Sequence, residues 1–270
     1  MIPVINDYRK DKDQHFRRKE EVKKDERDVT DKIIIITGCN HGIGHQTALE
    51  LAKRGARVVM ACRDLTKAEA AKEYILKEVP NGKLEVVKLD LGEFNGAREF
   101  SNLIHAKFDH VDVLINNAGM YKFDGKIRRT NDGFEEHMGV NHLNPFLLTL
   151  LLLDLLAKSE RSRIVCVAST FSLLQEFNVN DLNMENFKKF GVYAPYANSK
   201  MANILFMREL ARRLGENSNI NCYAICPGMV NIERVEDQSF LRRFLFIFAK
   251  YWGFLDLENV SDYGLKFWKI

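Results

Sequence analysis

From Lys32 onward, short apolar runs rich in β-branched residues alternate with longer stretches whose apolar positions recur every three or four residues. The short runs are too continuously apolar for strands with one face in water. They predict buried strands at 33–37, 57–61, 84–89, 111–116, 163–169 and 221–226. The longer stretches predict helices at 45–55, 65–79, 96–108, 144–160 and 196–215. This alternation predicts an α/β fold with a doubly wound parallel sheet of six strands.

The N-terminal segment has a different pattern. Residues 1–30 alternate positive and negative charges and contain no long apolar run, so we expect a charged arm and no signal peptide or N-terminal membrane anchor. For this arm a solvated helix or a disordered segment is favoured over a phosphate- or lipid-binding tail.

Composition narrows the function classes without naming one. The 270 residues are 46% hydrophobic, enough for a sizeable core, and the net charge of +3 argues against a dedicated nucleic-acid binder. Five scattered cysteines argue against a disulfide framework and for a reducing, cytoplasmic location. Cys222 and Cys226 have a metal-like spacing, but their apolar surroundings favour two buried core thiols, and we expect no metal site.

The first expected strand runs directly into a glycine-rich segment, TGCNHGIG, at 37–44. Glycines here allow positive φ angles and let a pyrophosphate approach the free N–H groups where the first helix begins, as in a Rossmann dinucleotide site. His41 and His45 have the spacing of a metal pair, but a dication would compete with the cofactor, so exposed turn residues are the better interpretation. The expected cofactor contacts of this turn are Gly38, Cys39, Asn40, His41, Gly42, Ile43 and Gly44.

The end of the second expected strand bears on the choice of cofactor. An acid at this place would bind the ribose 2′-hydroxyl of NAD, but Cys62 stands there and Arg63 follows it. A guanidinium can bind the 2′-phosphate of NADP, so we predict NADP, that is NADPH in reduction. The alternative is a surface arginine that caps the strand or is neutralised by Asp64.

A tyrosine and a lysine four residues apart, Tyr196 and Lys200, begin the last expected helix after Pro195 and share one helical face. Tyr8 and Lys12 have the same spacing in the charged arm but no such context. A lysine cation about 4 Å from a phenol lowers its pKa by roughly three units, so we expect Tyr196 to titrate near neutrality.

Four motifs in this order resemble the short-chain dehydrogenase/reductase family: TGCNHGIG (37–44), NNAG (116–119), VNHL (140–143) and YANSK (196–200). The resemblance covers roughly residues 31–250. Its retinol-dehydrogenase-like branch is indicated by ACRD (61–64), VNHLNPFLLT (140–149), YANSKMANILF (196–206) and the basic and aromatic stretch after 240.

The resemblance implies a catalytic tetrad of Asn141, Ser169, Tyr196 and Lys200 in a dinucleotide-binding domain at 31–235. Tyr196 would deliver a proton to a carbonyl oxygen that Ser169 holds, while Lys200 hydrogen-bonds the nicotinamide ribose and Asn141 supports a water relay. The implied reaction interconverts a hydrophobic alcohol, retinoid-like or lipid-derived, and its aldehyde or ketone. The further implied cofactor contacts are Asp90, Asn117, Tyr196, Lys200 and Val230.

Near the C-terminus the sequence departs from the family pattern. Where the family usually has P-G-x-V-x-T, residues 227–232 read PGMVNI, and Ile232 cannot make the contact of a threonine with the nicotinamide. The residues that follow lack the usual final strand, so we expect the seventh strand of the fold to be missing. This favours, as the alternative to an enzyme, a catalytically silent NADP-binding or interaction protein.

Residues 236–270 are expected to form an amphipathic segment and a divergent tail. Within them, 240–255 places Arg242, Arg243 and Lys250 on one helical face among aromatic and aliphatic residues. This is typical of a helix at a membrane surface or of a lid over an apolar pocket, two interpretations that we leave open. The expected partners are thus a hydrophobic small molecule, a membrane or lipid surface such as the endoplasmic reticulum or a lipid droplet, and, by resemblance, a second copy in a homodimer.

Overall fold

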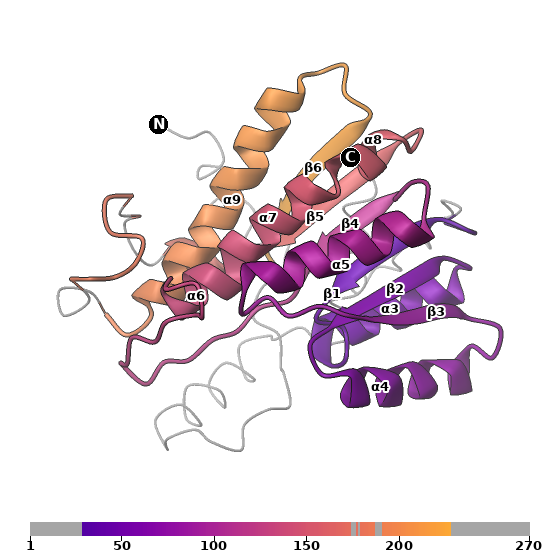
Figure 1. Cartoon of the computed structure of the whole chain (residues 1–270), viewed down its shortest axis with the longest axis horizontal. Coiled ribbons are helices and arrows are strands. Elements are labelled where there is room, and N and C mark those ends of the chain that lie inside the picture. The colour runs from indigo at the N-terminus through magenta and orange to yellow at the C-terminus, as the bar shows by residue number, and fades with distance from the viewer. Residues whose placement is uncertain (1–28, 174–176, 178, 187–190, 228–270) are drawn as a thin grey trace, which may run out of the picture.

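The protein folds around one parallel sheet of six strands, seen in a computed structural model that describes residues 29–173, 177, 179–186 and 191–227. The strand order is β3-β2-β1-β4-β5-β6, and every neighbouring pair is parallel (Figure 1). The strands are β1 (Ile33–Thr37), β2 (Arg57–Cys62), β3 (Lys83–Lys88), β4 (Val113–Asn116), β5 (Ser162–Val167) and β6 (Ile220–Ile225). The predicted doubly wound sheet is confirmed, and each predicted strand boundary lies within two residues of the observed one.

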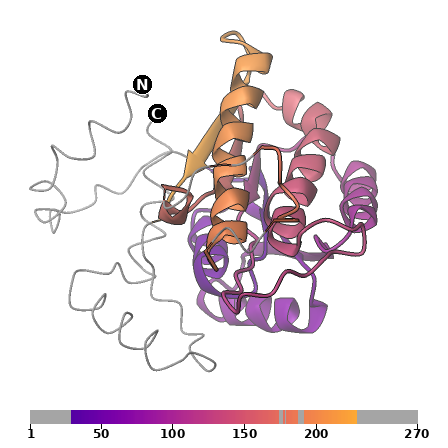
Figure 2. The same cartoon turned by 90° about the vertical axis from the view of Figure 1, so that its left-hand side faces the viewer.

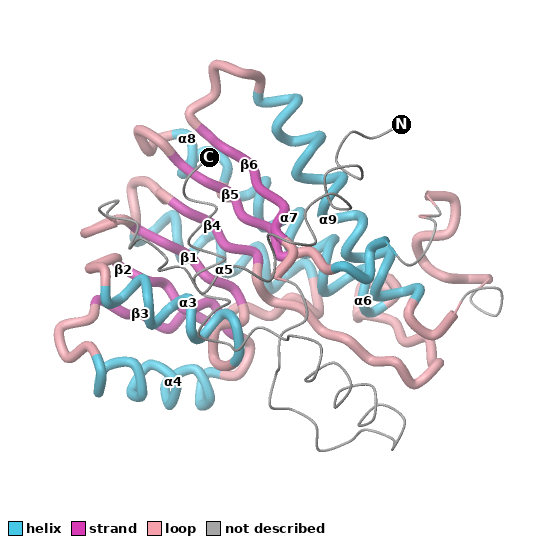
Figure 3. The backbone as a smooth tube through the Cα atoms, turned by 180° about the vertical axis from the view of Figure 1, so that it is seen from behind, coloured by secondary structure: helices cyan, strands magenta, loops and turns pink. Residues whose placement is uncertain are grey.

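Helices cover both faces of the sheet because alternate strand residues point to opposite sides. Helices α5, α7, α8 and α9 lie on one face of the sheet, and α3 and α4 lie on the other (Figure 3). Ile33 and Ile35 pack toward the first group, whereas Ile34 and Ile36 pack toward the second. Figure 2 shows the long α9 beside β6. The helical elements are α3 (Gly42–Lys53), α4 (Leu65–Glu78), α5 (Phe94–Lys107), α6 (Glu136–Met138), η1 (Gly139–Leu143), α7 (Asn144–Leu151), α8 (Leu153–Ala157), η2 (Thr170–Leu173) and α9 (Ala194–Leu214).

Two local expectations are wrong. Cys226 is exposed and Cys222 is only partly buried, because β6 is the outer strand of the described sheet and Cys226 lies beyond its end. His45 is not an exposed turn residue: it lies within α3, half-buried, with its ring 5.5 Å from that of Tyr74. All five cysteines are free thiols.

Several expectations lie outside the described residues: the charged arm up to residue 28, Val230, Ile232, the 240–255 segment and the missing seventh strand. Within the described ranges, no helix is long and apolar enough to cross a membrane. The same part of the chain contains no group of three His, Cys, Asp or Glu side chains that could hold a metal ion.

Candidate active site

The loops that follow the parallel strands all lie at one edge of the sheet, where doubly wound proteins bind their ligands. The glycine turn follows β1, Arg63 follows β2, Asp90 follows β3, Asn117 follows β4 and Ser169 follows β5. The topology therefore brings to one edge the residues that the sequence predicts to bind a cofactor and those it predicts to do the chemistry.

The glycine turn needs glycine for two physical reasons. Gly38 and Gly42 have φ angles of 64° and 60°, which side chains other than glycine rarely adopt. At Gly44 there is no space for a side chain, since an added Cβ would lie 2.4 Å from the Asn117 Nδ2 and 2.8 Å from the Gly38 carbonyl oxygen. The N-cap residue of α3, His41, makes no side-chain hydrogen bond to the first turn. The N–H groups of that turn thus remain available for an anionic group.

The side chain of Asn117, in the loop after β4, holds the glycine turn in place. Its side-chain amide donates to the carbonyl oxygens of Thr37 (2.9 Å) and Gly38 (3.1 Å). The Thr37 hydroxyl in turn accepts hydrogen bonds from the backbone N–H groups of Asn117 (3.1 Å) and Ala118 (2.9 Å). The sequence singled out Asn117 as a cofactor contact but missed Thr37, although the threonine directly precedes the first glycine of the motif. In this structure both residues hold the loops after β1 and β4 together.

Arg63 is exposed at the end of β2. Its neighbour Asp64 does not neutralise it but caps α4, accepting from the Lys67 N–H (3.1 Å) and pairing with the Lys67 ammonium (3.0 Å). Cys62 is buried, with its sulfur 3.8 Å from that of Cys39 in the glycine turn. Asp90 is half-buried and accepts a hydrogen bond from the Gly92 N–H at 2.8 Å.

The four predicted catalytic residues come from three regions and converge. Tyr196 and Lys200 lie in the first half of α9, and the Ser169 hydroxyl lies near enough to the Tyr196 phenol to lower its pKa. Gly119 lies between Lys200 and Asn141: a Cβ added to it would lie 3.2 Å from the Lys200 Nζ and 3.5 Å from the Asn141 Oδ1. The fold therefore brings together the tetrad that the resemblance implies.

The electrostatics of the tyrosine differ from the expectation. Lys200 is buried, with its Nζ 5.7 Å from the centre of the Tyr196 ring, and it donates to the Val167 carbonyl oxygen at 2.8 Å. Burial raises the pKa of Tyr196 above its usual value, although the Ser169 hydroxyl opposes this. Burial also lowers the pKa of Lys200 to about 8. Removal of the phenol from water thus outweighs the opposing effect of Ser169, and the phenol is not made acidic as the sequence led us to expect.

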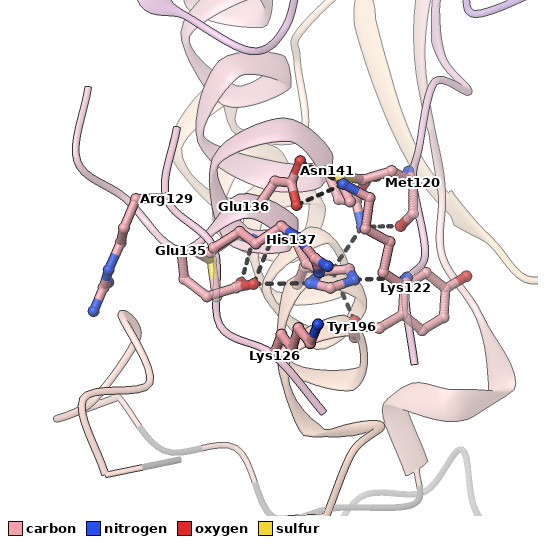
Figure 4. A network of polar contacts seen from close by, with 12 residues as sticks. Met120, Lys122, Lys126, Arg129, Glu135, Glu136, His137, Asn141 and Tyr196 are labelled. Atoms are coloured by element: carbon pink, nitrogen blue, oxygen red, sulfur yellow. Dashed lines mark hydrogen bonds and ion pairs between the residues drawn. The ribbon is translucent and has the colours of Figure 1, made fainter. Parts of the chain in front are cut away.

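Asn141 is nearly fully buried in η1, a π-helical turn between α6 and α7 (Figure 4). Its Oδ1 accepts from the Met120 N–H (2.7 Å), and its Nδ2 donates to the Met120 carbonyl (3.0 Å) and to the Ser199 hydroxyl (3.0 Å). Its main-chain carbonyl accepts from the Asn203 amide at 3.0 Å. Such π turns often occur at functional sites because they re-aim side chains within a helix. The water relay through Asn141 stays a prediction.

Aromatic rings surround the Tyr196 phenol. Those of Phe123 and Phe171 lie 5.7 Å from it and that of Tyr121 lies 6.4 Å away, between ring centres. Phe123 also contacts Phe171 and Tyr193, and both Tyr121 and Tyr193 are exposed. Sequence reasoning missed this aromatic wall, made by Tyr121, Phe123, Phe171 and Tyr193. Its members come from the loop after β4, from η2 and from the residue before α9, and they share no periodic pattern.

Comparison with known proteins identifies the family of the chain. The family model for short chain dehydrogenases matches residues 32–239. Human retinol dehydrogenase 11 is 44% identical over 218 residues, which cover 81% of this chain and 67% of that protein. Human retinol dehydrogenase 12 is 43% identical over 210 residues, covering 78% of this chain and 65% of the relative. The chain thus spans about two thirds of the length of these two curated relatives.

Solved structures share the fold. An uncharacterised protein from Mycobacterium paratuberculosis superposes with a TM-score of 0.65 at 34% identity, covering 87% of this chain and 74% of its own. A short chain dehydrogenase from Escherichia coli CFT073 complexed with NADPH gives a TM-score of 0.62 at 24% identity, covering 78% and 85%. The chain belongs to the short-chain dehydrogenase/reductase family of oxidoreductases, in its retinol-dehydrogenase-like branch.

Proposed function

We propose that this protein is an NADP-dependent oxidoreductase that interconverts a hydrophobic alcohol and its aldehyde or ketone. The observation that carries the proposal is the convergence of Tyr196, Ser169, Lys200 and Asn141 at the sheet edge that also holds the glycine turn. A dinucleotide bound on that turn and a substrate bound beside the phenol would share one pocket.

The cofactor would be held mainly by the turn at 37–44. Its positive-φ glycines, and the lack of room for a side chain at Gly44, fit the close approach of a pyrophosphate to the N-terminus of α3. The exposed Arg63, with no acid at position 62, favours the 2′-phosphate of NADP over the free ribose of NAD. Asp90, Asn117, Lys200 and Val230 would complete the contacts. Bound NADPH would supply the hydride for the carbonyl carbon.

The protonation states of the residues suit reduction. Because burial raises its pKa, Tyr196 is a neutral phenol at pH 7 and can donate its proton to a carbonyl oxygen. Ser169, whose hydroxyl lowers the pKa of the phenol, would hold the same oxygen and stabilise the charge that develops on it. Lys200, whose pKa is lowered to about 8, can return a proton to the tyrosine near physiological pH.

The substrate class is inferred from the aromatic wall and from the relatives. Tyr121, Phe123, Phe171 and Tyr193 offer an extended apolar surface next to the phenol, which favours a retinoid-like or lipid-derived substrate. The relatives reported above are retinol dehydrogenases by name. A membrane or lipid surface at 240–255, a cytoplasmic or peripheral location and a homodimer remain part of this proposal.

One sequence observation favours a second candidate. Ile232 stands where the family has a threonine that contacts the nicotinamide, which fits a catalytically silent protein that binds NADP without turnover. NADPH binding is common to both candidates, so turnover separates them.

The test uses the purified full-length chain with NADPH, NADH and a panel of apolar and short aldehydes. We expect NADPH at a hundred times its Kd to add about 2.7 kcal/mol to the free energy of unfolding and so to raise the melting temperature. NADPH should be oxidised when an apolar aldehyde is added. NADPH binding without oxidation by any aldehyde or ketone would support the silent binder. The absence of any NADPH effect would contradict both.

A further inference from the structure

A buried carboxylate and imidazole lie beside the tetrad but belong to none of the motifs discussed above. Glu135 and His137 are 1% and 3% exposed, and the His137 Nδ1 lies 2.8 Å from the Glu135 Oε1 (Figure 4). Glu135 also caps α6: its carboxylate accepts from the backbone N–H groups of His137 (3.0 Å) and Met138 (2.8 Å). Each hydrogen bond that this carboxylate makes in the described structure therefore needs it as an acceptor.

The hydrogen bonds fix which imidazole nitrogen carries the proton. The His137 Nε2 lies 3.0 Å from the Lys122 backbone nitrogen, whose N–H can only donate, so Nε2 accepts and carries no proton. The proton of the neutral ring therefore resides on Nδ1 and points at Glu135. The carboxylate thus selects the tautomer that can hold Lys122.

This bond completes a clamp on the segment after β4. Asn141, four residues after His137, holds Met120 by both its N–H and its carbonyl, while His137 holds the Lys122 N–H. Between these two points lies Tyr121, whose ring faces Tyr196 at 6.4 Å. The His137 ring itself lies edge-on to the Tyr196 ring, 6.3 Å between centres. One face of α6 and η1 therefore sets the distance between the phenol and the Tyr121 ring of the aromatic wall.

We propose that Glu135 and His137 are positioning residues that hold Tyr121 and Phe123 against Tyr196 and thereby set the preference of the site for long apolar substrates. Among the described residues, the pair makes no hydrogen bond to the predicted cofactor turn or to the Ser169 hydroxyl. It meets the site through the wall and through the edge of the Tyr196 ring. The kinetic consequence rests on the proposed function. The tautomer and the clamp do not depend on it.

Glu135→Gln is the sharpest perturbation, because it keeps the size of the side chain while it removes the negative charge and replaces one acceptor oxygen with a donating NH₂ group. In either orientation of the amide, its NH₂ group faces an N–H donor, of His137 or of Met138. If the imidazole proton moves to Nε2 to relieve the conflict, it meets the Lys122 N–H instead, and the clamp opens. A matched control is Glu136→Gln, the next residue, whose carboxylate pairs with the exposed Lys122 ammonium at 2.9 Å.

We expect Glu135→Gln to lower kcat/KM for a long apolar aldehyde about tenfold, chiefly by raising KM. Its kcat/KM for a short aldehyde and its Kd for NADPH should stay within about twofold of the values for the unmodified chain and for Glu136→Gln. Equal losses on long and short aldehydes, unchanged kinetics on both, or the same change in Glu136→Gln would each overturn the proposal.

A second measurement needs neither a variant nor turnover. Nitrogen-15 spectra of histidine-labelled protein should show His137 with a protonated Nδ1 and an unprotonated Nε2, and the Lys122 amide should exchange slowly with solvent. A protonated Nε2 would overturn the clamp. If no aldehyde is reduced while the predicted tautomer is found, the proposed function fails and the clamp stands.

Discussion

The predicted cofactor turn after β1 and the predicted catalytic pocket around α9 lie at the same sheet edge, but they are built in opposite ways. The turn works through the backbone: it needs the absence of side chains at Gly38, Gly42 and Gly44. The pocket works through buried polar side chains, such as Asn141, whose partner Ser199 is 58 residues away in the chain. Requirements of the first kind are local and appear as a motif. Those of the second kind depend on tertiary packing.

Asn117 connects the two regions, since its amide supports the glycine turn from the loop that also carries Gly119 of the pocket. A substitution in the glycine turn should therefore disturb the pocket less than a substitution at Asn117. Substitutions in the turn and in the pocket can be distinguished by which measured property, NADPH affinity or turnover, each leaves intact.

The largest expected effect is in the pocket alone. Tyr196→Phe removes the proton that the reaction needs and nothing that the turn uses, so turnover should fall by about 10²- to 10⁴-fold. NADPH affinity, measured by titration, should remain within about twofold. Tyr8→Phe, the spacing twin in the arm, serves as the control and should turn over normally. Near-normal turnover in Tyr196→Phe would remove the assigned acid.

The second change affects the turn alone. Gly44→Ala places a Cβ within 2.9 Å of backbone atoms of Gly38 and Cys39, so the turn must shift, and NADPH affinity should fall by roughly a hundredfold or more. Gly191→Ala is the matched control, since its Cβ meets no atom within 4 Å in the described structure. Calorimetric titration of both variants decides. Unchanged NADPH binding in Gly44→Ala would contradict the role of the turn.

The third change tests the cost of burying Lys200. The pKa of Lys200 is about 8 in the folded chain, whereas the usual value is 10.5. Below pH 8 the buried ammonium is charged, and its removal from water lowers the free energy of unfolding by the full amount. Between pH 8 and pH 10.5 the unfolded state binds more protons than the folded state, so the free energy of unfolding rises with pH. Lys200→Met should therefore be more stable than the wild type at pH 7, by on the order of 2 kcal/mol. Urea unfolding from pH 7 to 10 should show that difference shrinking; a constant difference would contradict the shift.

The smallest expected effect concerns cofactor choice. Arg63→Ala should weaken NADPH by roughly tenfold and leave NADH within about twofold, because only the 2′-phosphate loses a charged partner. Lys67→Ala is a nearby control that removes another exposed cation, one already paired with Asp64. Equal weakening of both cofactors would exclude a phosphate-specific role for Arg63.

The sequence predicted the sheet well because buried parallel strands leave continuous apolar runs, as in 33–37, and amphipathic helices leave a period of three to four. The tetrad was found through motifs, not through spacing alone. The acidity of Tyr196 was not predicted correctly, because Coulomb attraction at an assumed 4 Å omitted the desolvation of both groups. The pair Glu135 and His137 was missed because no sequence pattern around His137 shows that its imidazole accepts from the Lys122 N–H.

The most direct test of the central claim follows the transferred atom. NADPH carrying deuterium at its transferable position, prepared as both stereoisomers, is mixed with the full-length chain and an apolar aldehyde, and the product alcohol is analysed by mass spectrometry. We predict one deuterium per alcohol from one stereoisomer and none from the other, with the yield lost in Tyr196→Phe. Alcohol without deuterium from either stereoisomer, or an equal yield in Tyr196→Phe, would contradict the central claim.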